Sequence, residues 1–130
     1  MSKKETPLTR AYWKNIGGTL IEEFPAVRAT KDNGPRYIDA VIILGEETKK
    51  AKFKEVKIKG KDVICVQTKA GRLGMCLMGQ ALFSEKLMRR FEPRSIKSVV
   101  SQRYRVRPEL CRIFTNRMFH LGKNIRFDIQ

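Results

Sequence analysis

Three polar residues stand within otherwise apolar segments of the 130-residue chain: Asp39, Gln67 and Lys69. Asp39 lies in the run 37–44, where apolar residues occupy both parities and predict a strand buried on both faces. An unpaired carboxylate there would cost several kcal/mol, so Asp39 must be paired, hydrogen-bonded or hold a cation. Gln67 and Lys69 share one parity of the predicted strand 62–69, so both side chains point to the same face.

If the strands that carry them lie close together, these three residues supply what phosphodiester hydrolysis requires. A carboxylate and a neutral amide oxygen can hold a hard cation such as Mg²⁺ beside the scissile phosphate. The metal would activate water and neutralise developing charge, and the lysine would orient the water or stabilise the transition state. The cluster therefore predicts a metal-dependent site for cutting phosphodiesters.

The charge of the chain indicates a polyanionic partner. Lysine and arginine total 28 against 13 acidic residues, which gives a formal net charge of +15. Basic side chains that neutralise phosphates release condensed counterions, so this charge favours nucleic acid. No basic amphipathic helix, long apolar run or lipidation signal indicates a membrane. The isolated Cys65, Cys76 and Cys111 and the single His120 lack the spacing of a zinc site.

The elements that must position these residues alternate along the chain. We expect helices over residues 8–25, 73–91 and from Pro108, and strands over residues 37–44, 50–59, 62–69, 96–102 and 124–129. Pro25 would close the first helix, a bulge near Glu55 would interrupt the lysine-rich strand, and Phe83 would face the core from the second helix. The order α-β-β-β-α-β-α-β predicts a single α/β domain over residues 1–130, with a mixed central sheet flanked by helices.

The pattern of residues resembles the PD-(D/E)xK nuclease superfamily, which includes many restriction enzymes and archaeal Holliday-junction resolvases. That family carries an Asp on one strand, Glu-x-Lys on a later strand, and then a helix. Residues 37–41 are similar to the Asp strand, and residues 66–69 to the second motif, with glutamine in place of glutamate. Residues 79–82 resemble a glutamine motif of several branches. The resemblance spans about residues 9–129 and implies a restriction-endonuclease-like three-layer α/β fold.

The resemblance also implies a role for each site residue. Asp39 and Gln67 would bind the metal together with the backbone carbonyl of Thr68, and Lys69 would activate or orient water. The family often carries a glutamate on its first helix, and helical geometry favours Glu23 for this assisting role. The implied cofactor is Mg²⁺ or Mn²⁺, and the implied activity is that of a metal-dependent DNA endonuclease.

Six further residues are expected to contact nucleic acid: Gln80, Lys57, Lys59, Arg72, Arg103 and Arg105. The lysine-rich segment 50–61 is equally typical of a solvated edge strand that resists aggregation. We expect a homodimer or higher homo-oligomer, because so small a nuclease does not easily cut both DNA strands alone. With DNA as partner and no export signal behind Met1, we expect a cytoplasmic, nucleoid-associated protein.

Several alternatives stay open at this point. Residues 55–57 form a literal Glu-x-Lys, although no helix follows them as one follows Lys69. Asp39 could instead be salt-bridged to Arg36, Lys69 could be a solvated strand end, and Gln80 could be an ordinary helix-surface residue.

Two other functions compete with the nuclease. A neutral oxygen at Gln67 binds Mg²⁺ more weakly than a carboxylate would, which favours a non-catalytic DNA- or RNA-binding module on the same fold. A basic architectural or RNA-binding protein of unrelated fold is the third hypothesis. It predicts no buried Asp39 and no convergence of Gln67 with Lys69.

Overall fold

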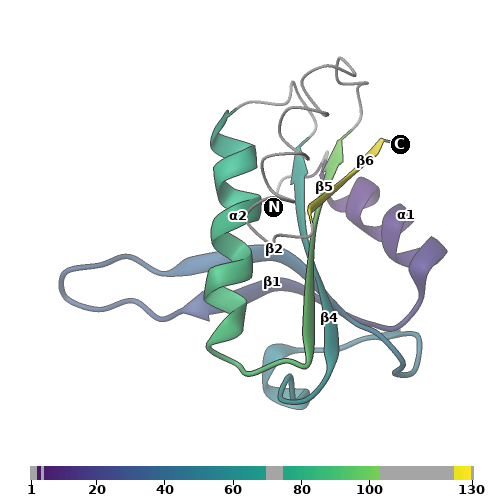
Figure 1. Cartoon of the computed structure of the whole chain (residues 1–130), viewed down its shortest axis with the longest axis horizontal. Coiled ribbons are helices and arrows are strands. Elements are labelled where there is room, and N and C mark those ends of the chain that lie inside the picture. The colour runs from purple at the N-terminus through teal and green to yellow at the C-terminus, as the bar shows by residue number, and fades with distance from the viewer. Residues whose placement is uncertain (1–2, 4, 70–74, 103–124, 130) are drawn as a thin grey trace.

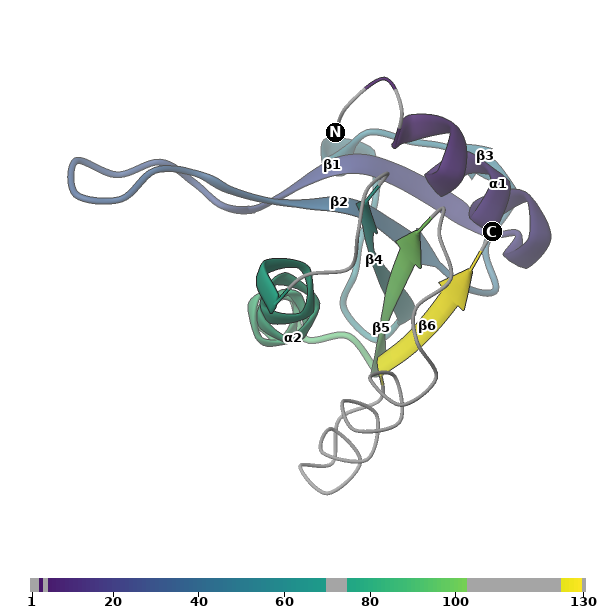
Figure 2. The same ribbon diagram turned by 90° about the horizontal axis from the view of Figure 1, so that it is seen from above.

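The computed structural model of the protein describes residues 3, 5–69, 75–102 and 125–129. These residues form a mixed sheet with one helix on each face (Figures 1 and 2). The helices are α1 (Thr6–Ile16) and α2 (Met75–Arg89). The strands are β1 (Thr19–Val27), β2 (Arg36–Ile43), β3 (Lys49–Lys50), β4 (Asp62–Lys69), β5 (Ser95–Gln102) and β6 (Ile125–Ile129). The α/β class and the mixed sheet expected from the sequence are confirmed.

The sheet places β2 and β4 side by side at its centre. Its strand order is β3-β1-β2-β4-β5-β6. Strand β2 pairs antiparallel with both β1 and β4, whereas β4, β5 and β6 run parallel to one another. The segment between β2 and β4 does not intervene in the sheet, so the strand with Asp39 lies directly beside the strand with Gln67.

Apolar residues that alternate along the central strands bury against the two helices on opposite faces. On one face Tyr12 of α1 packs with Leu20, Ile42 and Ile64. On the other face Met88 of α2 packs with a cluster that includes Ile21, Phe24, Val41, Val63 and Cys65. Because both faces of β2 and β4 are covered along most of their length, a polar side chain away from the exposed strand ends, such as Asp39 or Gln67, lies in partly or wholly buried surroundings.

The helix expected over residues 8–25 is wrong in its second half. Helix α1 ends at Ile16, and residues 19–27 form strand β1 instead. Gly17 and Gly18 have φ values of +78° and +85°, a backbone conformation that terminates a helix. Ile16, Leu20 and Phe24 are apolar and spaced as on one helix face, but they lie in two different elements. Pro25 lies inside β1 beside a register shift.

The lysine-rich strand expected over residues 50–59 is also wrong. Only Lys49–Lys50 pair with β1, and Phe53–Glu55 form a short 3-10 helix. Phe53, Val56 and Ile58 pack against the core beneath α2 rather than alternating across a sheet. In place of the bulge expected near Glu55, the chain forms a turn of 3-10 helix.

The other expected elements agree with the structure where it describes them. Strands β4, β5 and β6 match the predicted positions closely, and α2 lies within the predicted helix 73–91. The third helix, expected from Pro108, falls outside the described residues. Within the part of the chain that the structure describes, no helix has the length and apolar character needed to span a membrane.

The loop between β1 and β2 continues both strands outward as a long hairpin that projects away from the sheet (Figures 1 and 2). The loop and the first two residues of β2, residues 28–37 together, are all exposed. Its turn is closed by the Thr30 amide, which donates to the Asn33 carbonyl at 2.8 Å. We call residues 28–37 the hairpin arm.

Candidate active site between strands β2 and β4 and helix α2

A cavity of about 510 Å³ lies where β2 and β4 meet α2. Strand β2 contributes Asp39 and β4 contributes Gln67 to its wall. The remaining lining residues are Arg36, Tyr37, Gly79, Gln80, Phe83, Ser84 and Leu87. We call it the β2–α2 cavity, and it brings together two of the residues that the sequence singled out.

The Asp39 carboxylate is held where the pairing of β2 with β4 ends. The last paired residues there are Ala40 and Val66. One step further along, the Thr68 amide donates a 2.9 Å hydrogen bond to Oδ2 of Asp39. The carboxylate thus takes the place of a backbone carbonyl as acceptor, which fixes its position relative to β4.

An irregularity shared by β1 and β2 places Asp39 at this point. Ile38 and Val41 both join the core beneath α2, although residues three apart on a regular strand face opposite sides. On β1 the residue level with Asp39 is Glu23, because Glu22 pairs with Ala40 and the next registered pair is Phe24 with Ile38. Glu23 has a φ of 51°, so both strands depart from regular geometry beside the candidate site.

The electrostatic surroundings disfavour the charged form of Asp39. Burial raises the pKa of this carboxyl, and the charges of Glu5 and Glu23 raise it further, whereas the Thr68 amide opposes the rise. Arg36, the alternative salt-bridge partner, donates instead to the Pro35 carbonyl, and Asp39 has no ion pair among the described residues. A carboxylate in this situation gains from a bound cation.

Gln67 is fixed by a relay of hydrogen bonds from α2. It is 4% exposed, and its Nε2 donates to Oγ of Ser84 at 2.6 Å. The Ser84 hydroxyl in turn donates to the backbone carbonyl of Gln80, also at 2.6 Å. The relay uses the nitrogen of the Gln67 amide, so the amide oxygen is left as the half that can serve a ligand. Gln80 itself is exposed at the cavity wall.

Thr68 contributes its backbone to the site and its side chain to the opposite face. Its hydroxyl lies 2.8 Å from that of Thr9, a buried contact that ties α1 to β4. The structure places its amide nitrogen at Asp39, and the role of its carbonyl as a metal ligand stays a prediction.

Lys69 is the last residue of β4 and is exposed, and its side chain is not among those that line the cavity. Strand alternation gives it the same side as Gln67. The expected helical position of Glu23 is wrong, because this residue lies on β1, where it is exposed. The carboxylate of its neighbour Glu22 forms ion pairs with Arg10 at 2.8 Å and with Lys50 at 3.1 Å.

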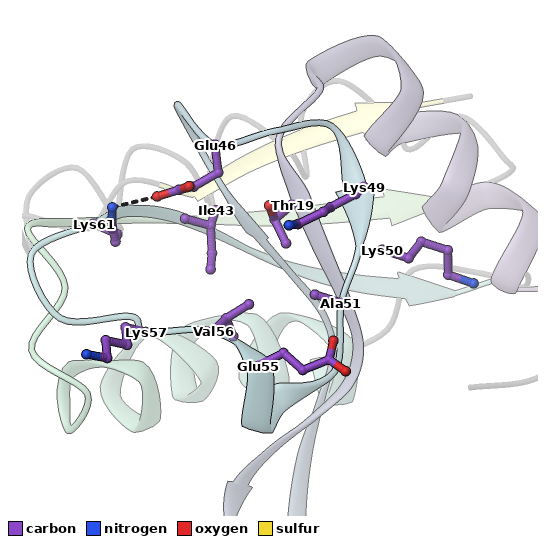
Figure 3. A pocket seen from close by; sticks show the side chains of 10 residues that line it. All are labelled: Thr19, Ile43, Glu46, Lys49, Lys50, Ala51, Glu55, Val56, Lys57 and Lys61. Carbon is purple, nitrogen blue, oxygen red and sulfur yellow. Dashed lines mark ion pairs between the residues drawn. The ribbon is translucent and has the colours of Figure 1, made fainter.

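The residues expected to contact nucleic acid are placed unevenly. Lys59 lies 3.5 Å from Glu92, and Lys57 lines a second cavity of about 360 Å³ (Figure 3). In that cavity Lys50 and Lys57 extend in opposite directions, and Lys61 is paired with Glu46. These charges do not converge on one point. Arg72, Arg103 and Arg105 fall outside the described residues.

The rival Glu-x-Lys at residues 55–57 does not share a cavity with Asp39. Glu55 lies in the 3-10 helix, where its carboxylate accepts the Lys52 amide at 3.0 Å. Glu55 lines the second cavity, of about 360 Å³, and not the β2–α2 cavity.

Sequence reasoning missed the aromatic side chains at the site. Phe83 was expected in the core but is 55% exposed on the cavity wall. The signal was present in the spacing, because the buried residues Leu77, Ala81 and Met88 define a helical stripe and Phe83 is two positions from Ala81. Tyr37, 58% exposed, also lines the cavity and stands two residues before Asp39.

Comparisons of the chain with known proteins found no relative. A scan against protein-family models, a search of curated proteins and a search of solved structures each gave no match to the chain. The interpretation of the site therefore depends on the geometry and chemistry of its own residues.

Proposed function

We propose that the protein is a metal-dependent DNA endonuclease whose centre is formed by Asp39, Gln67 and Lys69. The observation that carries this proposal is the convergence of a half-buried carboxylate and a fixed amide in one open cavity. Neither group is neutralised by a cationic side chain among the described residues. A restriction-endonuclease-like fold is part of this proposal, and the mixed sheet between two helices is compatible with it.

The donor set suits Mg²⁺ or Mn²⁺. Both ions prefer oxygen ligands, and the Asp39 carboxylate, the Gln67 amide oxygen and a backbone carbonyl of Thr68 are of that kind. The raised pKa of Asp39 supports the fit, because a cation offsets the unfavourable burial of its charge. The described residues hold no group of three or more His, Cys, Asp or Glu side chains placed to bind one metal ion, so besides Asp39 the site would depend on the neutral oxygens of Gln67 and Thr68 and on water. The ion would supply Lewis-acid activation of water and stabilise negative charge on the phosphate.

The side chains have separate tasks under this proposal. Asp39, held by the Thr68 amide, would present its carboxylate to the cation at the end of the β2–β4 pairing. Gln67 is immobilised by Ser84, so its oxygen is preorganised. Lys69 carries a positive charge at the exposed end of β4, where it would orient the attacking water or contact a phosphate oxygen. Attack of water on phosphorus breaks the bond to the leaving oxygen; the attacking water gives up one proton, and the leaving oxygen takes one up.

The hairpin arm supports DNA as the substrate. It carries Arg28, Lys31 and Arg36 against the single acidic residue Asp32, and all are exposed. Its base merges with the cavity, because Arg36 lines it. A projecting two-stranded ribbon with this charge suits the phosphates and grooves of a duplex. We also propose that the protein forms a homodimer or higher homo-oligomer, which would present two or more such sites to DNA. Analytical ultracentrifugation would test this oligomeric state.

The testing experiment is cleavage of labelled linear, nicked, branched and supercoiled DNA with Mg²⁺, Mn²⁺ or EDTA. Lys69→Ala should reduce metal-dependent cleavage by about 10²- to 10⁴-fold while DNA binding is kept. Lys14→Ala, at an exposed lysine of α1, is the matched control and should cut normally. Equal activity of Lys69→Ala and the parent protein would contradict the proposal.

A non-catalytic DNA-binding module is the second candidate, favoured by the amide at Gln67 where a second carboxylate would bind metal more strongly. Tight DNA binding with no cleavage under any metal would select it. Calorimetry with Mn²⁺ separates the two candidates further. The endonuclease should bind Mn²⁺ specifically and lose this binding in Asp39→Asn, whereas the DNA-binding module requires no such binding.

A further inference from the structure

The β2–α2 cavity is flanked by two aromatic side chains that face solvent. Among the described residues the large hydrophobic side chains that are exposed are Ile16, Tyr37 and Phe83, and the last two both line this cavity. Neither belongs to a core cluster. Their exposure therefore concentrates apolar surface at the candidate site.

The two rings come from different walls. Tyr37 lies on β2, two residues before Asp39, and Phe83 lies on α2, directly before the Ser84 that holds Gln67. Arg36 adds a cationic guanidinium to the same lining. Tyr37, Phe83 and Arg36 thus line the same cavity as Asp39 and Gln67, the two side chains that we propose bind metal.

This combination fits the chemistry of an unpaired nucleotide. A nucleobase offers a π-face that stacks on Tyr or Phe, and its phosphate offers charge to arginine. A base inside a continuous duplex has both faces covered by its neighbours, so it cannot stack on a protein ring without leaving the helix. The cavity volume of about 510 Å³ lies within the range of small-ligand sites.

We propose that Tyr37 and Phe83 form a stacking platform for an unpaired base, so that the site takes DNA with single-stranded or displaced nucleotides in preference to continuous duplex. The consequence for cleavage depends on the proposed nuclease function. The binding of the unpaired base does not depend on it, and it is testable without turnover.

The experiment measures binding in EDTA, with 2-aminopurine placed at an unpaired position of a short single strand and of a flap. Tyr37→Ala and Phe83→Ala should each weaken binding of these DNAs by roughly 5- to 150-fold, the equivalent of one lost base stack. Affinity for a matched duplex should be unchanged. Quenching of the 2-aminopurine fluorescence should fall in the alanine variants and be retained in Tyr37→Phe.

Ile16→Ala is the matched control, because it removes an exposed hydrophobic side chain on α1, away from the cavity. It should leave all affinities unchanged. Thermal melts should be alike for all variants, because the substituted side chains are exposed. A variant with a lowered melting temperature is assayed below its transition.

Equal loss of affinity for duplex and unpaired DNA would overturn the inference, as would no loss for either, or a stronger effect on RNA. Failure of the nuclease proposal gives a different result: the platform variants lose affinity for unpaired DNA, while no metal supports cleavage by the parent protein. Cleavage of continuous duplex that is indifferent to both aromatic residues would retain the nuclease and refute the platform.

Discussion

The main-chain amide of Thr68 donates a 2.9 Å hydrogen bond to Oδ2 of Asp39, across the point at which β2 and β4 cease to pair. The same residue, through its hydroxyl, lies 2.8 Å from the hydroxyl of Thr9 on α1. One residue of β4 thus links the candidate carboxylate to the helix on the far face of the sheet. Asp39 is consequently held by contacts among β2, β4 and α1 rather than by a loop.

Replacing Asp39 by asparagine should abolish cleavage but stabilise the fold at neutral pH. The pKa of Asp39 is raised by burial, so protonation of this carboxyl is more favourable in the folded than in the unfolded chain. That stabilisation is complete below the ordinary pKa of about 4 and is lost as pH rises through the raised value. Asparagine resembles the protonated carboxyl and still accepts the Thr68 amide. Thermal melts in EDTA should show a higher melting temperature for Asp39→Asn than for the parent at pH 7, with the difference shrinking towards pH 4.

Asp62→Asn is the control with the opposite sign. Hydrogen bonds from Arg94 and Ser95 lower the pKa of Asp62 to about 2, so its charge stabilises the fold above the ordinary pKa and this contribution is lost as pH falls through about 2. Asp62→Asn should therefore be less stable than the parent at pH 7, with a gap that closes in acid. Destabilisation of Asp39→Asn at pH 7 would show that a cationic group supports that carboxylate.

Gln67→Glu should weaken the metal-free fold and strengthen metal binding. A carboxylate has no proton for Ser84, whose own proton goes to the Gln80 carbonyl, so one hydrogen bond of the relay is lost. We expect a loss of about 1–3 kcal/mol in EDTA. Added Mg²⁺ should raise the melting temperature of this variant more than that of the parent, because binding to the folded state stabilises it.

Gln80→Glu is the matched control for this substitution, since Gln80 is exposed on the same cavity wall. It should cause little loss in EDTA, because its side chain is outside the relay. If Mg²⁺ shifts the melting temperature of Gln67→Glu no further than that of the parent, the cavity is not a cation site.

Removing the positive charges of the hairpin arm should reduce the salt dependence of DNA binding. The triple variant Arg28→Gln, Lys31→Gln, Arg36→Gln loses up to three phosphate contacts. The slope of log affinity against log salt should therefore fall by up to about 3, at roughly one per contact. Fluorescence anisotropy with a duplex between 50 and 200 mM salt, the range over which such contacts dominate, measures the slope.

A second triple variant decides whether the lysine-rich segment 50–61 is a solvated surface or a second contact with DNA. It replaces three of its exposed lysines by glutamine, namely Lys54, Lys57 and Lys59. Because the charges of this segment are spread and partly paired, we expect a smaller change of slope than for the arm. An equal or larger change would assign the main contact to the segment instead.

Gly18 should tolerate no side chain. Its φ is +85°, and an added Cβ would collide with the carbonyl oxygen of Ile43. Gly45 has a similar φ of +75° with open space around it, so Gly45→Ala carries the backbone strain alone. Urea unfolding should show a loss of about 1 kcal/mol for Gly45→Ala and a clearly larger loss for Gly18→Ala. Equal losses would mean that the turn between α1 and β1 shifts to make room.

The part of the site that could be predicted from sequence depends on period-two patterns. Alternation over residues 62–69 placed Gln67 and Thr68 on opposite faces, which their contacts with Ser84 and Thr9 confirm. The apolar run around Asp39 predicted a central strand, and that is where β2 lies. Both patterns are local, and both strands are covered on their two faces, so tertiary structure did not override them.

The errors came from apolar residues whose spacing had another cause. Ile16, Leu20 and Phe24 stand at helical intervals, but the left-handed Gly17 and Gly18 divide them between α1 and β1. Phe53 and Ile58 are apolar because they pack on the core from a loop and a 3-10 turn. Sequence alone does not distinguish such packing from strand pairing, because both require buried hydrophobic side chains.

Strand β2 carries both Arg36, at the base of the hairpin arm, and Asp39, in the cavity. Three residues of strand span about 10 Å, which corresponds to about three nucleotide steps along a duplex strand. Under the proposed function this strand fixes the distance between the phosphate contact at Arg36 and the point of cleavage at Asp39, because the pairing of Ala40 with Val66 anchors its inner end. Lengthening the tip of the arm would extend the protein's footprint on DNA, while the point of cleavage relative to Arg36 would stay where β2 sets it.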